Sequence, residues 1–127
     1  EKFSDENTLV CGTGGFCDGK SIAAAFAMGA DGVQMGTRFL ATEESDFCEL
    51  WKKMVVDCAD GGTIIARGFV GPARWLRSEG DVEHAMAGAG ECAQRITDLP
   101  KTKDMVEKVM GDAEAIIRGL AAKYVAD

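Results

Sequence analysis

Two short apolar segments that each run into glycine constrain the fold of this chain more than any other feature of its sequence. Residues 8–11 precede Gly12, and residues 32–35 precede Gly36. Apolar runs of this length bounded by glycine are typical of buried strands. Between them lies an alanine-rich segment, residues 21–28, which is typical of a thin helix that packs close to a sheet. This order predicts a βαβ unit whose strands run parallel with a right-handed crossover.

The glycine turns after the two predicted strands carry the first hypothesis on function. Parallel strands end at the same edge of a sheet, so the turn at residues 12–15 and the turn at Gly36 are expected side by side. Glycine lets a ligand approach the backbone, and several N–H groups together suit a phosphate dianion. The last two strands of a (β/α)8 barrel commonly hold a phosphate in this way. The alternative is a pair of tight turns, as in any α/β fold, that bind nothing.

A dinucleotide-binding loop explains the first glycine turn less well. The run from Gly12 to Cys17 resembles the fingerprint GxGxxG, but a cysteine stands where the third glycine would allow close packing of helix and strand. The acidic residue that would hold a ribose should end a second strand, whereas Asp31 precedes the second strand here. Cys17 is interpreted as a small residue that fills the turn, in preference to a reactive thiol.

Composition argues against two classes of function. The formal charge is −7, and the 14 lysines and arginines are scattered among 21 acidic residues, so a nucleic-acid partner is not expected. The most apolar stretch, residues 21–30, is shorter than the roughly 18 residues that a membrane helix needs, so no membrane partner is expected. At 127 residues with 46% apolar content, the chain is long enough for one domain with a modest core.

The cysteines and the single histidine do not have the spacing of a metal site. Five cysteines are present, an odd number, and no two of them stand in a CxxC pair. His84 has no cysteine near it in the sequence, so no metal site is predicted. We expect reduced thiols and a cytoplasmic location.

An extended arm is predicted between two helical regions in the middle of the chain. A helix is expected to begin at Thr42 or Ser45, because several acidic residues follow and suit the positive end of the helix dipole. Its buried face is predicted to comprise Phe47, Leu50, Trp51, Met54, Val55 and Cys58. Residues 61–80 contain several glycines and are expected to form an extended, irregular arm.

Residues 81–127 are predicted to form a helical carboxyl-terminal segment. Two closing helices are expected within it, over residues 102–110 and 112–125. The second has a partial apolar stripe of Ala115, Ile116, Leu120 and Tyr124. Together with a βαβα part over residues 1–60 and the arm over residues 61–80, this segment completes three predicted regions.

Two stretches of this sequence resemble the nitronate monooxygenase family, formerly called the 2-nitropropane dioxygenase family. They are GGFCDG at residues 14–19 and ADGVQMGTRFLATEE at residues 30–44. The resemblance is continuous over residues 9–44, weaker over residues 63–77 and loosest near the carboxyl end. Members of the family are (β/α)8 barrels that bind FMN without a covalent bond. The resemblance implies an α/β fold class, in which this chain forms the carboxyl-terminal portion of a TIM barrel (strands seven and eight and the following helices) plus a helical terminal segment.

The resemblance also implies which residues bind the FMN phosphate. Gly14 and Gly15 match the loop after strand seven, whose backbone N–H groups meet the phosphate. The loop after strand eight completes the cradle, with a threonine hydroxyl as a further donor, and its matching residues are Gln34, Met35, Gly36 and Thr37. Arg38 is expected to pack or to form a salt bridge. No catalytic residue is assigned, because His84 does not match the catalytic histidine that many members carry on an earlier barrel loop.

The family resemblance implies an FMN-dependent oxidoreductase, and the leading expectation is the oxidation of alkyl nitronates with O2. Alternatives within the family are the NAD(P)H-dependent reduction of an enoyl-acyl carrier protein or of a quinone. Alternatives outside it are a non-flavin phosphate-binding barrel, such as an enzyme like inosine monophosphate dehydrogenase, and an assembly module without catalysis.

The small number of predicted strands implies that other protein segments complete the fold. Two strands cannot close a barrel, so we expect a piece of a longer protein that is inactive by itself and binds FMN weakly. Its open strand edges are expected to pair with the remainder of the parent chain or with a second copy.

Overall fold

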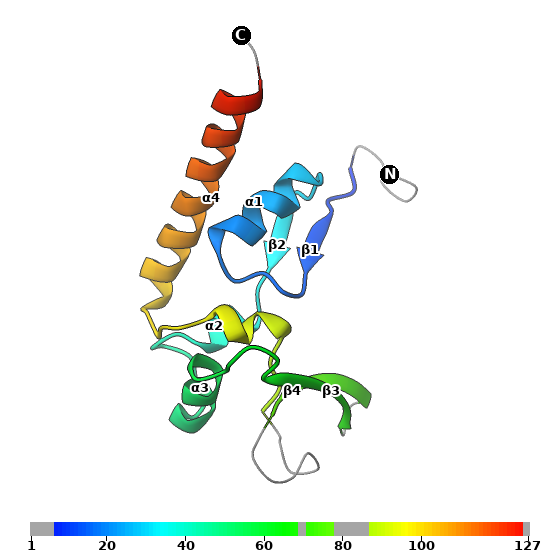
Figure 1. The fold of residues 1–127 in the computed structure, drawn as a ribbon, viewed down its shortest axis with the longest axis vertical. Coiled ribbons are helices and arrows are strands. Elements are labelled where there is room, and N and C mark those ends of the chain that lie inside the picture. The colour runs from blue at the N-terminus through cyan, green and yellow to red at the C-terminus, as the bar shows by residue number, and fades with distance from the viewer. Residues whose placement is uncertain (1–6, 69–70, 78–86, 126–127) are drawn as a thin grey trace. The chain divides into compact units, whose positions relative to one another are not determined.

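The predicted strand, helix and strand are present at the start of the computed structural model, which describes residues 7–68, 71–77 and 87–125. They are β1 (Cys11–Thr13), α1 (Gly19–Ala27) and β2 (Gly32–Gln34). β1 and β2 lie side by side in parallel, with Cys11 opposite Gly32 and Thr13 opposite Gln34 (Figure 1). The predicted parallel pairing is therefore confirmed, and the chain belongs to the α/β class.

The chain divides into two compact units. The first unit consists of Glu1–Met35 and Lys103–Asp127, and the second consists of Gly36–Thr102. The first unit therefore joins the strands and α1 to nearly all of α4 (Thr102–Tyr124), although these segments are far apart in the sequence (Figure 1).

A reciprocal pair of hydrogen bonds fixes the start of α1. The backbone N–H of Ser21 donates to Oδ1 of Asp18 at 2.8 Å, and the backbone N–H of Asp18 donates to Oγ of Ser21 at 3.3 Å. This arrangement is a capping box, in which two groups that the helix itself leaves unpaired are satisfied together. Asp18 is the N-cap residue of α1. Cys17 next to it is buried, as expected for a residue that fills the turn.

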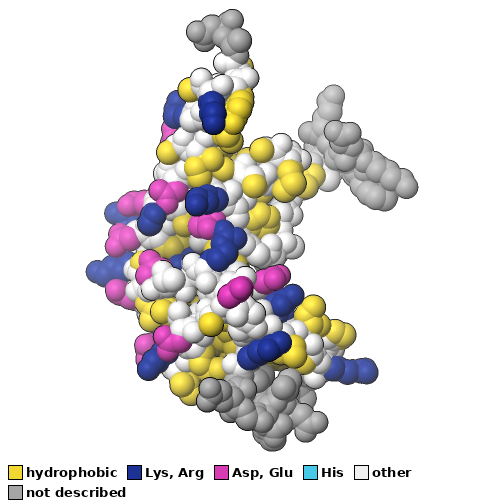
Figure 2. Space-filling view, viewed as in Figure 1, with side chains coloured by type: hydrophobic (Ala, Val, Ile, Leu, Met, Phe, Trp, Pro, Cys, Tyr) yellow, Lys and Arg dark blue, Asp and Glu magenta, His cyan; other side chains and the backbone are white. Residues whose placement is uncertain are grey.

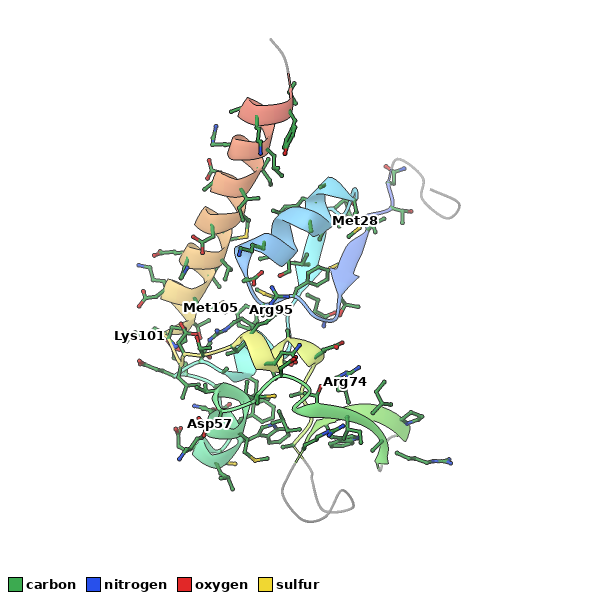
Figure 3. All side chains as sticks on the ribbon, viewed as in Figure 1. Met28, Asp57, Arg74, Arg95, Lys101 and Met105 are labelled. Carbon is green, nitrogen blue, oxygen red and sulfur yellow. The ribbon has the colours of Figure 1, made fainter. Side chains whose placement is uncertain are left out.

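The core of the first unit lies between α1 and α4. Five buried side chains form it, and they are Ile22, Ala23, Met105, Val109 and Ala113. The α4 residues recur at intervals of four, so they lie on one face of the helix, and Met105 stands near its start (Figure 3). Gly19 brings the two helices close together, because a Cβ added there would lie 2.5 Å from Cβ of Asp112.

The prediction of two closing helices is wrong, because α4 is one continuous helix that passes through Gly111. Glycine costs about 1 kcal/mol in a helix interior, which packed residues on both sides can offset. Three ion pairs at spacing four, beginning at Lys103, Lys108 and Glu114, support the outer face. Charged side chains accordingly cover much of the first half of α4 in Figure 2. The predicted apolar stripe is only partly buried, since Ile116 packs against the core while Leu120 and Tyr124 are exposed.

The first strand is much more exposed than the sequence predicts. Leu9 and Val10, which precede β1, are 81% and 46% exposed, and the three residues of β1 are exposed or half-buried. Among the described residues β1 pairs with β2 alone, so its other edge is open. The prediction of a buried strand is wrong for this chain, because burial depends on neighbouring segments that the sequence pattern does not specify.

The second unit contains two short α-helices, a hairpin and a 3-10 helix. Its elements are α2 (Thr37–Leu40), α3 (Glu49–Val56), β3 (Thr63–Gly68), β4 (Gly71–Leu76) and η1 (Glu91–Arg95). Residues 81–86 of the predicted helical segment lie outside the described residues, and residues 87–101 contain η1 as their only helix, contrary to the prediction.

β3 and β4 form an antiparallel hairpin where an irregular arm is predicted. Thr63 pairs with Leu76 at one end and Gly68 with Gly71 at the other. The glycines and Pro72 stand near the connection between the strands, where they interrupt little of the pairing. Trp75 of β4 also forms an isolated bridge with Gly88. Residues 63–68 and 71–76 are extended, as expected, but regular, while residues 69–70 and 78–80 of the predicted arm lie outside the described residues.

α3 begins later than predicted. Cys48 precedes its first turn, whereas neither Thr42 nor Ser45 caps it. The buried hydroxyl of Thr42 instead donates to the carbonyl of Phe39 at 2.8 Å. The predicted apolar face is only partly buried, since Val55 is fully buried and Leu50 is exposed. No helix among the described residues is both long and apolar enough to cross a membrane.

Candidate functional site

The loop after β1 contains two adjacent glycines with unusual backbone angles. Gly14 has a φ of +86° and Gly15 a φ of +81°, in the left-handed region that side chains other than glycine rarely adopt. A Cβ built at either position would have no atom within 4 Å. The backbone of this loop is therefore open to a ligand in the first unit, and glycine is required for its shape.

β2 ends at the same edge of the strand pair as β1. Because Thr13 lies opposite Gln34, the loop with Gly14 and Gly15 and the residues after β2 leave the pair at the same level. Gln34 is exposed, while the side chain of Met35 packs against the core of α1 and α4. The structure thus gathers four of the six predicted phosphate-binding residues at one edge of the first unit.

The other two predicted residues, Gly36 and Thr37, follow directly in the chain and belong to the second unit. Gly36 precedes α2, and a Cβ built on it would meet no atom within 4 Å. Oγ1 of Thr37 accepts a hydrogen bond of 2.8 Å from the backbone N–H of Gly90. This bond fixes the hydroxyl through its oxygen and leaves its proton available to donate.

Arg38 has a structural role in the second unit. Its side chain is buried, and Nη1 lies 2.7 Å from Oδ1 of Asp98. Nη2 donates to the carbonyl of Ala41 at 2.7 Å and to the carbonyl of Asp98 at 3.0 Å. The expectation that Arg38 forms a salt bridge is confirmed.

A pocket in the second unit lies beside Thr37, and sequence reasoning missed it. Its volume is about 670 Å³. The side chains that line it include Thr37, Leu40, Phe47, Trp51, Arg74 and Trp75, and the backbone of residues 88–90 forms a further wall. The one available signal is that Trp51 and Trp75 are the only two tryptophans of the chain. We call this cavity the tryptophan pocket.

The Glu44 carboxyl and the Cys58 thiol of the second unit have shifted pKa values, and neither shift points to catalysis. Hydrogen bonds from the backbone and side chain of Thr102 lower the pKa of the Glu44 carboxyl, which holds the start of α4. Burial raises the pKa of the Cys58 thiol, so the thiol stays protonated near neutral pH and is a poor nucleophile. Within residues 7–68, 71–77 and 87–125, no group of three histidine, cysteine or acidic side chains is placed to hold a metal ion. His84 lies outside those residues.

The chain is similar to known proteins in sequence. Residues 9–79 match the family described as "Nitronate monooxygenase". A probable nitronate monooxygenase of Staphylococcus saprophyticus is 36% identical over 74 residues, which are 58% of this chain and 21% of that protein. The chain spans about a fifth of the length of such curated relatives.

Solved structures resemble the chain over most of its length. FabK from Thermotoga maritima has a TM-score of 0.82 and 28% identity, over 92% of this chain and 48% of FabK. The nitroalkane oxidase from Streptomyces ansochromogenes has a TM-score of 0.78 and 26% identity, over 90% of this chain and 42% of the oxidase. Because the family match covers more than half of its residues, this chain belongs to the nitronate monooxygenase family, a family of oxidoreductases.

Proposed function

We propose that this chain is the carboxyl-terminal part of an FMN-dependent (β/α)8 barrel, and that the whole protein oxidises alkyl nitronates with O2. One observation carries the proposal: the adjacent left-handed glycines Gly14 and Gly15 lie in open space at the carboxyl edge of two parallel strands. Loops at this edge are where barrels of this kind bind phosphate groups. Membership in the nitronate monooxygenase family supports the choice of cofactor and substrate.

The residues present fit an FMN phosphate by their donor chemistry. A phosphate dianion needs several hydrogen-bond donors and close approach of the backbone. Gly14, Gly15 and Gly36 leave the space beside their backbones open, and the Thr37 hydroxyl retains a proton to donate. Our proposed set of phosphate ligands is therefore the backbone N–H groups of Gly14, Gly15, Gln34, Met35 and Gly36 together with the Thr37 hydroxyl.

In the proposed mechanism, FMN and the protein have separate roles. FMN, when bound, supplies the electron-transfer chemistry, and the protein supplies position and electrostatics. In this chain the glycine loops hold the phosphate. The backbone N–H of Gly90 donates to Oγ1 of Thr37, so the hydroxyl proton is left to donate to the phosphate. We assign the general base and the substrate contacts to segments of the protein outside this chain.

The open strand edges support the proposal that further segments complete the barrel. β1 and β2 each have one partner strand among the described residues, and a barrel has no free edges. We propose that the remainder of the protein supplies the missing strands, or that a second copy does. The formal charge of −7 argues against a nucleic-acid partner, and we place the protein in the cytoplasm.

The first test uses the complete protein that carries this sequence. We expect a flavin absorption spectrum as purified, and consumption of O2 when propyl nitronate is added without NAD(P)H. The Gly15→Ala variant should lose FMN affinity, because alanine is strained at a φ of +81°. Gly32→Ala is the matched control, since that glycine has open space and no left-handed angle. A protein without flavin, or a Gly15→Ala variant with unchanged affinity, would contradict the proposal.

A second candidate is an NAD(P)H-dependent reductase of an enoyl-acyl carrier protein or of a quinone, with FMN as cofactor. The TM-score of 0.82 to FabK favours this candidate over a non-flavin phosphate-binding barrel. The same protein preparation separates the candidates, because a reductase oxidises NAD(P)H in the presence of a quinone or an enoyl thioester and ignores nitronates. A non-flavin phosphate-binding barrel would show neither activity nor flavin colour.

The isolated chain of 127 residues gives an independent check of the phosphate site. We expect it to bind FMN weakly, because the phosphate is one of several groups by which a protein holds a flavin. Titration of FMN with the chain, followed by flavin fluorescence, measures the affinity. A submicromolar dissociation constant would overturn the view that most contacts lie elsewhere.

A further inference from the structure

A second cavity of the second unit lies along one face of α3, and we call it the α3 pocket. Its volume is about 470 Å³, within the range of roughly 300–1,000 Å³ that is usual for small-molecule sites. Residues at spacing three and four on α3 and at its carboxyl end line the pocket, and they are Leu50, Lys53, Met54 and Asp57. Leu76 and Arg77, at the end of β4, form a further part of the wall. None of the described residues that line the α3 pocket lines the tryptophan pocket or belongs to the proposed phosphate ligands.

The apolar part of the α3 pocket is aliphatic. Leu76 is 2% exposed and Met54 is half-buried, whereas Leu50 is 70% exposed. None of the described side chains that line the pocket is aromatic, so nothing in this wall favours a flat ring over a flexible chain. The Cys58 thiol lines the pocket as well, and burial raises its pKa, so the thiol stays uncharged near neutral pH. An alkyl chain in the pocket would therefore cover leucine and methionine surface that is otherwise in water.

Backbone hydrogen bonds hold the wall of the α3 pocket in place. The N–H of Arg77 donates to the carbonyl of Gly62 at 2.8 Å, and the N–H of Gly62 donates to the carbonyl of Ala59 at 2.9 Å. These bonds tie the end of β4 to the turn that follows α3, and both Gly62 and Ala59 line the pocket. The N–H of Leu76 donates to the carbonyl of Ala87 at 2.9 Å. A wall fixed in this way loses little conformational freedom when a ligand binds, which favours affinity.

Two cationic side chains of the α3 pocket, Lys53 and Arg77, form no ion pair within the part of the chain that the structure describes. Glu49 precedes Lys53 by one helical turn, but its carboxylate pairs with Nζ of Lys52 at 3.3 Å. Asp57, at the carboxyl end of α3 in Figure 3, is the one acidic side chain among the described lining residues. The lining therefore has an excess of one positive charge, which is complementary to a ligand with a single negative charge.

We propose that the α3 pocket binds a small aliphatic carboxylate. The alkyl chain contacts Leu50, Met54 and Leu76, and the carboxylate pairs with Lys53 and Arg77. The two parts of the ligand match the two parts of the wall, since the apolar lining is aliphatic and the charged lining is positive by one unit. The inference does not rest on the proposed function, because no residue of this pocket belongs to the proposed phosphate site.

The test measures the affinity of three probes for the complete protein by titration calorimetry. The probes are octanoate; octanamide, which has the same chain without the charge; and butanoate, which has the charge with a shorter chain. We expect octanoate to bind about fivefold more tightly than octanamide, because pairing with two exposed cations contributes modestly. Octanoate should bind at least about tenfold more tightly than butanoate, because each added CH2 group that is buried strengthens binding. Equal affinities for the three probes, or no measurable binding of octanoate, would overturn the proposal.

Two double variants of equal net charge test whether the probe binds at this pocket. Lys53→Gln combined with Arg77→Gln should remove most of the difference between octanoate and octanamide, because the carboxylate then has no cationic partner. Arg67→Gln combined with Lys101→Gln is the matched control, since these cations belong to the same unit and do not line the pocket. All four side chains are exposed, so the substitutions should leave the fold intact. Equal effects of the two double variants would indicate nonspecific attraction and would overturn the proposal.

A titration in the presence of FMN separates this inference from the proposed function. The affinity of octanoate should be the same with and without saturating FMN, because the two sites share no residue. Displacement of octanoate by FMN would assign the probe to the flavin site and would overturn the proposal. A protein that binds octanoate at the α3 pocket but no flavin would contradict the proposed function and leave this inference standing.

Discussion

The two units of this chain are stabilised by different kinds of contact. In the first unit, apolar side chains of α1 and α4 pack together around Ile22, Met105 and Val109. In the second unit, polar side chains are buried as well. All four buried polar or charged side chains among the described residues lie there, and they are Arg38, Thr42, Lys52 and Thr63.

The buried polar groups of the second unit bond mainly to backbone carbonyls. Arg38 donates to the carbonyls of Ala41 and Asp98, and Nζ of Lys52 donates to the carbonyl of Glu43 at 3.0 Å. A short segment without regular structure leaves many carbonyls unpaired, and long cationic side chains can satisfy several of them at once. In the first unit, regular helices and strands satisfy the backbone carbonyls, so apolar packing alone is needed. Substitutions in the two units should therefore lower the free energy of unfolding for different reasons.

The largest expected effect is in the second unit, at Asp98. The Asp98→Ala variant leaves the buried guanidinium of Arg38 without its carboxylate, so we expect a loss of about 3 kcal/mol in the free energy of unfolding. Urea denaturation followed by tryptophan fluorescence measures this loss, because both tryptophans lie in the second unit.

Asp60→Ala is the control for Asp98→Ala. Asp60 is exposed, so removing its carboxylate should change the stability by less than about 0.5 kcal/mol. If the two variants lose the same stability, burial of the Arg38 guanidinium has no special role, and the contrast between the units is not supported.

The corresponding test in the first unit is the close contact between α1 and α4. A methyl group at Gly19 would lie 2.5 Å from Cβ of Asp112 and 2.7 Å from the backbone nitrogen of Ala113. The Gly19→Ala variant should therefore lose about 2 kcal/mol, because neither helix can move without opening the core. Circular dichroism during thermal unfolding measures the change.

Gly111→Ala provides a control with the opposite sign. A Cβ at Gly111 meets no atom within 4 Å, and the residue lies in the middle of α4. Alanine there should stabilise the helix by up to about 1 kcal/mol. A Gly19→Ala variant as stable as the parent would show that the two helices are less closely packed than the structure indicates.

The first unit could be predicted largely from its sequence, because its signals are local. Glycines bound both strands, and Asp18 with Ser21 carries the capping pattern that starts α1. The prediction of a break at Gly111 is wrong because glycine has a known local cost in a helix, while the packing that offsets this cost is not visible in the sequence. The exposure of Leu9 was missed for a similar reason, as burial depends on neighbouring segments.

The second unit was harder to predict because its contacts join distant positions. Arg38 bonds to Asp98, and Gly90 bonds to Thr37, and neither pair leaves a periodic pattern. The sequence predicts an irregular arm here because Gly68, Gly71 and Pro72 interrupt most strands. In this hairpin they stand at the turn end, where they disrupt little of the pairing.

The glycine loops and the tryptophan pocket differ in the same way. The glycine loops at Gly14 and Gly15 were predicted because their backbone shape requires glycine. The tryptophan pocket was not predicted, because Trp51 and Trp75 are brought together only by the fold of the second unit. Local constraints on the backbone are visible in a sequence, whereas a wall formed by two distant side chains is not.

The smallest expected effect distinguishes exposed polar contacts from buried ones in the second unit. Oε2 of Glu44 accepts hydrogen bonds of 2.8 Å from both the N–H and the hydroxyl of Thr102, at the start of α4. These bonds hold the pKa of the folded carboxyl below its ordinary value of 4.5. The stability that they provide is therefore complete above pH 4.5 and is lost as the pH falls through the lowered pKa of the folded state.

Two glutamine variants test this acid dependence. In Glu44→Gln this part of the acid dependence should be absent, while Glu43→Gln should keep it, because Glu43 contributes backbone groups to its contacts with Pro100 and Lys52. Unfolding by urea between about pH 2 and pH 7, roughly the range over which carboxyls titrate, measures the three curves. An acid dependence of Glu44→Gln identical to that of the parent would show that this exposed contact is not coupled to folding, and that burial is what makes polar contacts matter in the second unit.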